Sequence, residues 1–244
     1  MLNIETEGYL LAAEPYQEYD ALVSLFTPEQ GLLRGLVKGG LSRAKRSHLQ
    51  VGNALSIRWS ARLADQLGRV ELSTEVSWPG RVMDSSLRLL ALASLCDLLN
   101  ATLSERQAEP EIYEGLGGWL ETLPSPYWGE ALVVFELELL RCLGFGLDLT
   151  RCAVTGQRHD LAYVSPRSGR AVSLAVAQPY AERLLVLPGF LSGQAESGAE
   201  ALCQGLELTG HFFAKHLFYP REQNLPPSRA LLLRRLAATQ TGQS

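Results

Sequence analysis

Residues 55–62, Leu-Ser-Ile-Arg-Trp-Ser-Ala-Arg, alternate between apolar and polar side chains along their whole length. Successive side chains of a β-strand point to opposite faces, so Leu55, Ile57 and Trp59 share one face and both arginines share the other. The segment therefore predicts a half-buried strand with a basic outer face.

Four more short apolar runs surround this strand in residues 1–80. They are separated by turn signals such as Thr27-Pro28 and Gly39-Gly40. Five short strands over about 70 residues are typical of a small closed or partly open barrel. We therefore predict an N-terminal oligonucleotide-binding (OB) barrel in residues 1–80, with the other strands at Gly8–Ala13, Ala21–Phe26, Leu32–Lys38 and Val70–Val76.

Helical spacing of apolar residues replaces the strand pattern after Trp78-Pro79-Gly80. Residues 81–244 are therefore expected to form a mainly helical domain, which makes the fold class α+β. Residues 151–175 carry too many turn residues for a helix, so a small irregular or hairpin insertion is expected in a loop at about 151–177. The expected helices run from Asp84 or Ser85 to about Ser104, then Pro110–Leu123, Glu130–Leu143, Tyr180–Leu187, Ala199–Leu217, and from Ser228 onward.

The composition is that of an ordinary globular protein, with 46% apolar and 20% charged residues in a chain of 244. The four cysteines are scattered, which indicates reduced thiols and not a disulfide framework. The N-terminus lacks the basic region of a signal peptide, and no run of about 18 apolar residues occurs. We therefore expect a cytoplasmic protein with no membrane partner.

Positive charge is concentrated in one segment, although the whole chain carries a net charge of −4. Residues 31–70 contain eight basic side chains and one acidic one, whereas the rest of the chain contains 14 basic and 25 acidic ones. Such separation of charge favours a polyanionic partner over a merely solvated basic surface. The candidate nucleic-acid-binding residues are Arg34, Lys38, Arg43, Lys45, Arg46, Arg58, Arg62 and Arg69.

Aromatic side chains are sparse in the basic segment, and both Trp59 and Phe26 are expected in the barrel core. Phosphate contacts give affinity without sequence information, because every nucleotide carries the same phosphate. Binding is therefore expected to be mainly electrostatic and indifferent to sequence.

No motif of an enzyme occurs in the chain. The sequence lacks G-x-S-x-G, H-E-x-x-H and G-x-x-x-x-G-K-[ST]. Glu136 and Glu138 are two positions apart on an expected helix, so they point to different sides and cannot form a catalytic pair. His211 and His216 are five apart, which is poor spacing for two metal ligands on one helical face. We therefore predict a protein that is not an enzyme.

Beyond these patterns, the sequence resembles the RecO family of bacterial recombination mediators nearly from end to end. In the N-terminal part the resemblance rests on Gly-Tyr-Leu-Leu at 8–11, Leu-Phe-Thr-Pro-Glu-Gln-Gly at 25–31 and Leu-Val-Lys-Gly-Gly at 36–40. In the helical part it rests on Phe-Glu-Leu-Glu-Leu-Leu at 135–140, Leu-Gly-Phe-Gly at 143–146 and Asp-Leu-Thr-Arg-Cys at 148–152. Tyr-Val-Ser-Pro-Arg-Ser-Gly at 163–169 and Leu-Pro-Pro-Ser-Arg at 225–229 complete the match.

The resemblance implies an OB fold followed by a helical domain, binding to single- and double-stranded DNA, and annealing of complementary strands at the nucleoid. It also implies three partners in homologous recombination of the RecFOR type: RecR, the C-terminal tail of single-stranded DNA-binding protein and, indirectly, RecA, whose loading the family assists. An acidic tail with an apolar end would fit a hydrophobic pocket with a basic rim. The candidate partner-binding residues for such a rim are Arg141, Lys215 and Arg221.

Some relatives carry a four-cysteine zinc site, and the matching positions here are Cys152, Thr155, Ser173 and Val176. Only Cys152 can supply a thiolate, and His159 is not at a ligand position of that pattern. Closed structural zinc sites normally use four nitrogen or sulfur ligands. We therefore expect no zinc and no other cofactor.

The residues alone leave two other classes of function open. Phosphate neutralisation does not distinguish DNA from RNA, because that discrimination requires contacts to the 2′-hydroxyl. An RNA-binding or chaperone-like OB protein is therefore compatible with the basic segment. A protein-docking scaffold, whose basic face binds an acidic protein, is compatible with it as well.

Overall fold

A computed structural model of the chain describes residues 2–63, 66–194 and 198–241. Its contacts divide the chain into two compact units, Met1–Leu120 and Glu121–Ser244. Strands give way to helices between Val76 and Trp78, and the first unit continues into helices that pack on its strands. The combination of an N-terminal barrel with a mainly helical remainder confirms the predicted α+β class.

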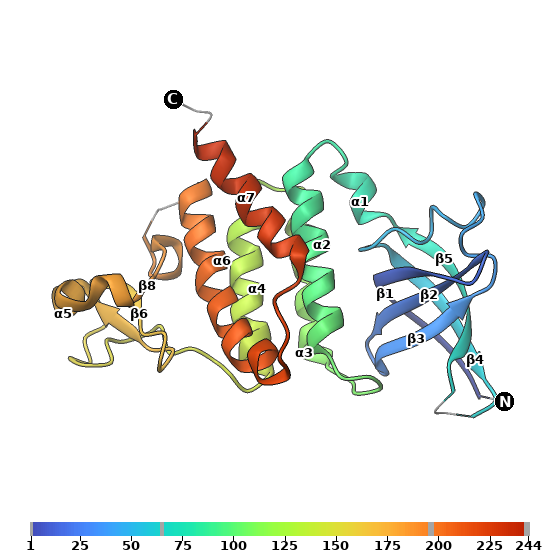
Figure 1. Cartoon of the computed structure of the whole chain (residues 1–244), viewed down its shortest axis with the longest axis horizontal. Coiled ribbons are helices and arrows are strands. Elements are labelled where there is room, and N and C mark those ends of the chain that lie inside the picture. Colours follow the sequence, from blue (N-terminus) through green and yellow to red (C-terminus); the bar gives the residue numbers. More distant parts are fainter. Residues whose placement is uncertain (1, 64–65, 195–197, 242–244) are drawn as a thin grey trace. The chain divides into compact units, whose positions relative to one another are not determined.

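The first unit is built on five strands that close into a barrel in the order β1-β2-β3-β5-β4 (Figure 1). Neighbouring strands are antiparallel except β3 and β5, which run parallel where Gly35 pairs with Gly68. A small five-stranded barrel of this kind is the OB architecture that the sequence predicts. The strands are β1 (Leu2–Tyr16), β2 (Asp20–Thr27), β3 (Gly31–Val37), β4 (Ala54–Ala61) and β5 (Gly68–Val76).

Strand β1 is far longer than the predicted run Gly8–Ala13. Its first half pairs with β4, from Leu2 opposite Ala61 to Tyr9 opposite Ala54. Its second half pairs with β2, and the register shifts between Leu10 and Ala12 as the strand bends from one neighbour to the other. The prediction was too short because residues 2–7 of β1 are largely polar and exposed, so this part of the strand lacks an apolar run.

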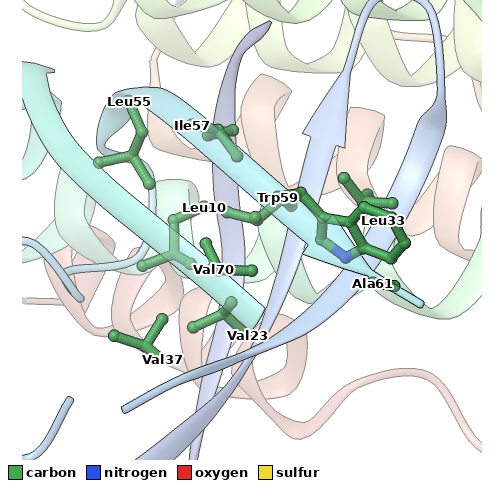
Figure 2. Close-up of a cluster of buried hydrophobic side chains, with 10 residues drawn as sticks. Leu10, Val23, Leu33, Val37, Leu55, Ile57, Trp59, Ala61 and Val70 are labelled. Carbon is green, nitrogen blue, oxygen red and sulfur yellow. The ribbon is translucent and has the colours of Figure 1, made fainter. Parts of the chain in front are cut away.

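The alternating residues of β4 form the centre of the barrel core, as their period predicts. Leu55, Ile57 and Trp59 are all at most 2% exposed. Figure 2 shows them in one cluster with side chains from the other strands. The Trp59 indole nitrogen donates a hydrogen bond to the carbonyl of Arg34 at 3.0 Å. Residue 68 must be glycine, because an added Cβ would lie 2.0 Å from the Trp59 ring.

Three helices complete the first unit: α1 (Trp78–Arg81), α2 (Ser86–Thr102) and α3 (Pro110–Thr122). The Ser85 hydroxyl caps α2 by accepting a hydrogen bond from the Arg88 backbone nitrogen, as the sequence allows. Tyr113 of α3 packs on the barrel, with ring centroids 5.1 Å from Tyr9 and 5.5 Å from Phe26. The barrel therefore shares an apolar interface with the helices that follow it.

The second unit combines helices with a small sheet. Helix α6 packs against both α4 and α7. The expected hairpin near residues 151–175 is present, because β6 pairs antiparallel with β7, and β8 adds to the other edge of β6. The elements are α4 (Trp128–Cys142), β6 (Leu161–Val164), β7 (Ala171–Ser173), α5 (Leu174–Ala177), η1 (Gln178–Arg183), β8 (Leu185–Val186), η2 (Gly189–Leu191), α6 (Ala199–Phe213), η3 (Ala214–Phe218), η4 (Tyr219–Arg221) and α7 (Pro227–Thr241).

The predicted helix Tyr180–Leu187 is wrong. The chain forms the short 3₁₀ segment η1 and then strand β8, because the backbone of Val186 finds a partner in Tyr163 of β6. The predicted helix Ala199–Leu217 is present as α6, but its last turn widens into the π-helical η3. Among the described residues, no helix has the length and apolarity needed to cross a membrane.

Candidate nucleic-acid interface

The connection between β3 and β4 carries the densest group of basic side chains in the barrel. We call residues 38–47 the basic loop. Its four cations are all exposed: Lys38, Arg43, Lys45 and Arg46. Within the described residues none of these four side chains forms an ion pair, although the Lys45 ammonium donates a hydrogen bond to the Lys38 carbonyl at 2.8 Å.

The basic loop is held in place by hydrogen bonds at both ends. At its start, the Asp20 carboxylate accepts a hydrogen bond from the Gly39 backbone nitrogen at 2.7 Å. Gly39 has φ +63°, a conformation that favours glycine. At the far end, the buried Asn53 amide donates to the carbonyls of Ser47 and His48 at 3.1 and 3.2 Å. The loop is therefore an ordered platform and not an open coil.

Arg34 differs from this group because it forms an ion pair with a carboxylate. Its guanidinium Nε lies 2.9 Å from Glu105 Oε1, which neutralises its charge locally. Glu105 itself pairs with the free edge of β3 beside Leu32, and the Arg106 backbone nitrogen donates to the Leu32 carbonyl at 3.0 Å. Glycine is required at position 31, because an added Cβ would lie 1.7 Å from the Gln107 carbonyl oxygen.

This packing covers the surface through which OB barrels commonly bind oligonucleotides, the outer face of strands β2 and β3. Phe26 and Leu32 are at most 1% exposed, although both lie outside the inner core cluster. Tyr113 and the segment around Glu105 occupy this face. Exposed basic residues of the first unit must therefore act from another part of the barrel surface.

Arg58 lies in an acidic setting that the sequence did not reveal. Its Nε donates to Glu5 Oε1 at 2.8 Å, and its Nη1 lies 3.5 Å from Glu71 Oε2. The hydrogen bond to Glu5 and the two carboxylates raise the pKa of Arg58. Glu7 and Glu75 are also exposed on β1 and β5. The outer face of β1, β4 and β5 therefore carries these four carboxylates against Arg58 and Arg69, which is a weakly acidic balance.

Arg62 and Arg69 are exposed at the two ends of the connection between β4 and β5. Neither forms an ion pair within the described residues. Of the eight predicted residues, the structure thus gathers four on the basic loop, leaves two exposed at the β4–β5 connection, and engages Arg34 and Arg58 with carboxylates.

Two exposed tyrosines beside the basic loop were missed by the sequence analysis. Tyr16 and Tyr19 flank the turn between β1 and β2, and Tyr19 is 68% exposed. The Tyr19 carbonyl accepts a hydrogen bond from the Leu41 backbone nitrogen at 3.0 Å, which joins the turn to the loop. The signal was a pair of aromatic residues around the polar turn Gln17-Glu18.

The second unit contains a separate hollow of about 200 Å³ lined by aromatic and glycine residues. The His216 ring stacks on Phe145 with centroids 4.6 Å apart, and the exposed Arg167 is also part of the lining. Burial, and the charges of Lys215 and His211, lower the pKa of His216, which favours its neutral form. The lining residues are Gly144, Phe145, Gly146, Leu147, Arg167, Ser168, Gly169, Phe212 and His216.

The predicted rim residues are placed differently around this hollow. The Lys215 ammonium donates hydrogen bonds to the carbonyls of Pro166 and Arg167, both at 2.8 Å, so it supports the wall. Arg141 pairs with Glu138, and this hydrogen bond lowers the pKa of Glu138. Arg221 is exposed in η4 and is not among the lining residues.

The four positions that match a zinc site form hydrogen bonds around one thiol. The buried Cys152 sulfur accepts hydrogen bonds from the backbone nitrogen and hydroxyl of Ser173, at 3.4 and 3.5 Å. Burial disfavours the thiolate, but the hydrogen bonds from Ser173 and Thr155 outweigh it and lower the pKa of Cys152 to about 6. One thiol, two hydroxyls and Val176 do not fit the four nitrogen or sulfur ligands of a closed zinc site.

Comparison with known proteins covers nearly the whole chain. The family model described as "Recombination protein O N terminal" matches residues 1–76, and "Recombination protein O C terminal" matches residues 83–225. A relative from Rhodospirillum centenum, named DNA repair protein RecO, is 42% identical over 237 residues, which is 96% of this chain and 95% of the relative. A relative of the same name from Granulibacter bethesdensis is 46% identical over 235 residues, 94% of this chain and 93% of the relative.

Proposed function

Since the chain belongs to the RecO family and so has a role in DNA repair and recombination, we propose that it binds single- and double-stranded DNA through the basic loop and catalyses no reaction. The proposal is supported above all by one observation: four exposed cations on an anchored loop have no carboxylate partner within the described residues. A phosphate backbone supplies the missing negative charge at regular spacing. The cover on the β2–β3 face supports the choice of this loop, because that face is not exposed to a strand.

Annealing of complementary strands follows from the same charge. Two single strands repel each other through their phosphates, and a basic surface that contacts both reduces this repulsion without nucleotide hydrolysis. In our proposal the protein brings strands together in this way and assists loading of the recombinase RecA during homologous recombination of the RecFOR type. It would act in the cytoplasm, associated with the nucleoid, and together with RecR.

The C-terminal tail of single-stranded DNA-binding protein is the third proposed partner. An acidic peptide with an apolar end needs a hydrophobic hollow beside a cation. The hollow formed by Phe145, Phe212 and His216 offers both, because the exposed Arg167 is part of its lining. Lys215 contributes by fixing the Pro166 and Arg167 backbone. We assign the tail to this hollow in preference to Arg221, which does not line it.

We also propose that the loop at 151–177 folds without zinc. The Cys152 thiol is already engaged by Ser173, and the other three positions offer no second sulfur or nitrogen side chain. Metal analysis of the purified chain should therefore give far less than one zinc per molecule, and dialysis against a chelator should leave its thermal unfolding unchanged. One tightly bound zinc per chain would overturn this part of the proposal.

The DNA-binding proposal is tested by fluorescence anisotropy of a labelled single strand at several salt concentrations. Four phosphate contacts predict a slope of log affinity against log salt of about −2.8, at ~0.7 per contact on single strands. Replacing Arg43, Lys45 and Arg46 by alanine should weaken binding and reduce the slope by about 2. The matched control removes three exposed arginines from the second unit, Arg158, Arg183 and Arg234.

The control should keep at least most of the wild-type slope, although its net charge changes by the same amount. A loop variant that binds like the wild type would refute the proposed site. Equal affinity for DNA and RNA strands of the same sequence would favour the RNA-binding alternative. Absence of any salt-dependent binding would favour the protein-docking scaffold.

A further inference from the structure

The turn between β1 and β2 places an aromatic ring beside the basic loop. It covers residues 17–19, and Gln17 has φ +54°, as expected for a tight reversal. Tyr16 pairs with Asp20 across the turn. The Asp20 carboxylate binds the Gly39 backbone nitrogen, and the Leu41 nitrogen binds the Tyr19 carbonyl. Turn and loop are therefore joined by two hydrogen bonds and form one surface.

Tyr19 has no structural role that explains its ring. The side chain is 68% exposed, and within the described residues it makes no aromatic contact and no cation–π contact. Leu41, next to it, is also exposed at 39%. The other ionisable side chain of the turn is Glu18, which is exposed and acidic. The turn therefore offers a nucleic acid a flat ring and not a further cation.

From this placement we propose that Tyr19 stacks on an unpaired base of a single strand whose phosphates lie on the basic loop. The inference rests on the proposed function and extends it by naming the part of the nucleotide that the turn contacts. Aromatic side chains beside a basic groove hold single strands in this manner, and the contact tolerates any sequence because every base has a π-face. It adds a contact to the mainly electrostatic binding that the sequence predicts, and this contact brings no counterion release.

The proposal separates two ligands that phosphate contacts alone would treat alike. Bases of a duplex are stacked on each other and are not available to Tyr19, whereas bases of a single strand can turn outward. The ring therefore gives the protein a preference for unpaired strands. The preference should persist at high salt, because it does not depend on displaced counterions.

The test compares a labelled oligo-dT strand with an abasic strand of the same length, which has the same phosphates but no bases. The wild type should bind oligo-dT more tightly by about 5-fold or more, the usual effect of one stacked base. Tyr19→Ala should lose this difference while keeping the salt slope and the affinity for duplex DNA. Tyr19→Phe, which retains the ring, should keep the difference. Tyr127→Ala is the control, since Tyr127 is 69% exposed and belongs to the second unit.

The outcomes also separate this inference from the proposed function. If the alanine variant of Arg43, Lys45 and Arg46 loses affinity but Tyr19→Ala still prefers oligo-dT, the basic loop stands and the stacking proposal is refuted. A loss of preference in Tyr19→Phe would also refute it, because the hydroxyl and not the ring would then matter. A loss of the oligo-dT preference in Tyr127→Ala would show that the effect is not specific to Tyr19, and this would also refute the stacking proposal. Thermal melting followed by circular dichroism, compared with the wild type, verifies that each variant is still folded.

Discussion

Arg229 is a charged residue in a buried environment. It is 2% exposed in α7, and its two terminal nitrogens bind both oxygens of Glu136 in α4 at 2.6 and 2.9 Å. The Thr209 hydroxyl of α6 donates a hydrogen bond to the same carboxylate and accepts one from Arg229. In the sequence Arg229 is one of several basic residues near the C-terminus. Its burial could not be predicted, because it depends on which faces of three helices meet.

Breaking this pair should cost more than any surface substitution. Arg229→Met leaves the Glu136 carboxylate buried without its cation, which typically lowers the free energy of unfolding by about 3–5 kcal/mol. Urea unfolding at neutral pH measures the loss. Adding Glu136→Leu should restore much of it, since an apolar pair of similar volume needs no charge balance. A single variant as stable as Arg234→Met, an exposed change on the same helix, would contradict this account.

At the scale of elements, the side chains that fill the barrel could be predicted from the sequence. The segments that pack on the outside of β2 and β3 could not. The alternation at Leu55, Ile57 and Trp59 identified β4 and its buried face, because a period of two has one geometric meaning in a strand. The cover on β2 and β3 was not predictable. Tyr113 reaches that face from α3 and Glu105 from the connection between α2 and α3, and nothing local marks them as partners of Phe26 or Arg34.

The packing of the segment around Gln107 on β3 can be tested by comparing alanine substitutions at two glycines. Gly31 and Gly39 have nearly equal φ, +61° and +63°, so alanine strains the backbone similarly at both. Around Gly39 nothing lies within 4 Å of an added Cβ, whereas at Gly31 the Gln107 carbonyl is in the way. Gly39→Ala should cost about 1–2 kcal/mol of unfolding free energy. Gly31→Ala should cost about 1–3 kcal/mol more, from forced repacking. Equal losses in chemical denaturation would show that the segment around Gln107 yields freely.

At the scale of the whole molecule, the sequence predicted a barrel followed by helices and a charge pattern with one basic segment. The eight candidate residues stay a prediction, and the neighbours that decide which of their charges remain free come from other parts of the chain. Glu5 and Glu71 lie across the sheet from Arg58, and sequence distance hides such pairs until the register is known. Tyr19 was passed over for the same reason, because its proximity to Leu41 is a tertiary contact.

The extent of the first unit leads to a prediction about fragments. A fragment of residues 1–122 keeps α2 and α3 on the barrel and should unfold cooperatively on heating. A fragment of residues 1–80 would expose Phe26 and Leu32, which are buried in the full chain, and should aggregate or melt without a clear transition. Calorimetry with light scattering distinguishes the two. Equal cooperativity in both fragments would mean that the strands alone suffice.

The row of Glu5, Arg58 and Glu71 has a kinetic consequence. With Glu7 and Glu75 beside it, one side of the barrel repels a polyanion, while the basic loop attracts it. These charges therefore orient an approaching nucleic-acid strand before any contact forms. Encounters in which the strand meets the acidic side have shorter lifetimes. Removing Glu71 would leave the contacts of the bound complex unchanged and yet speed its formation at low ionic strength, because it removes part of this repulsion. In this way carboxylates that never touch the ligand help to set how fast it arrives.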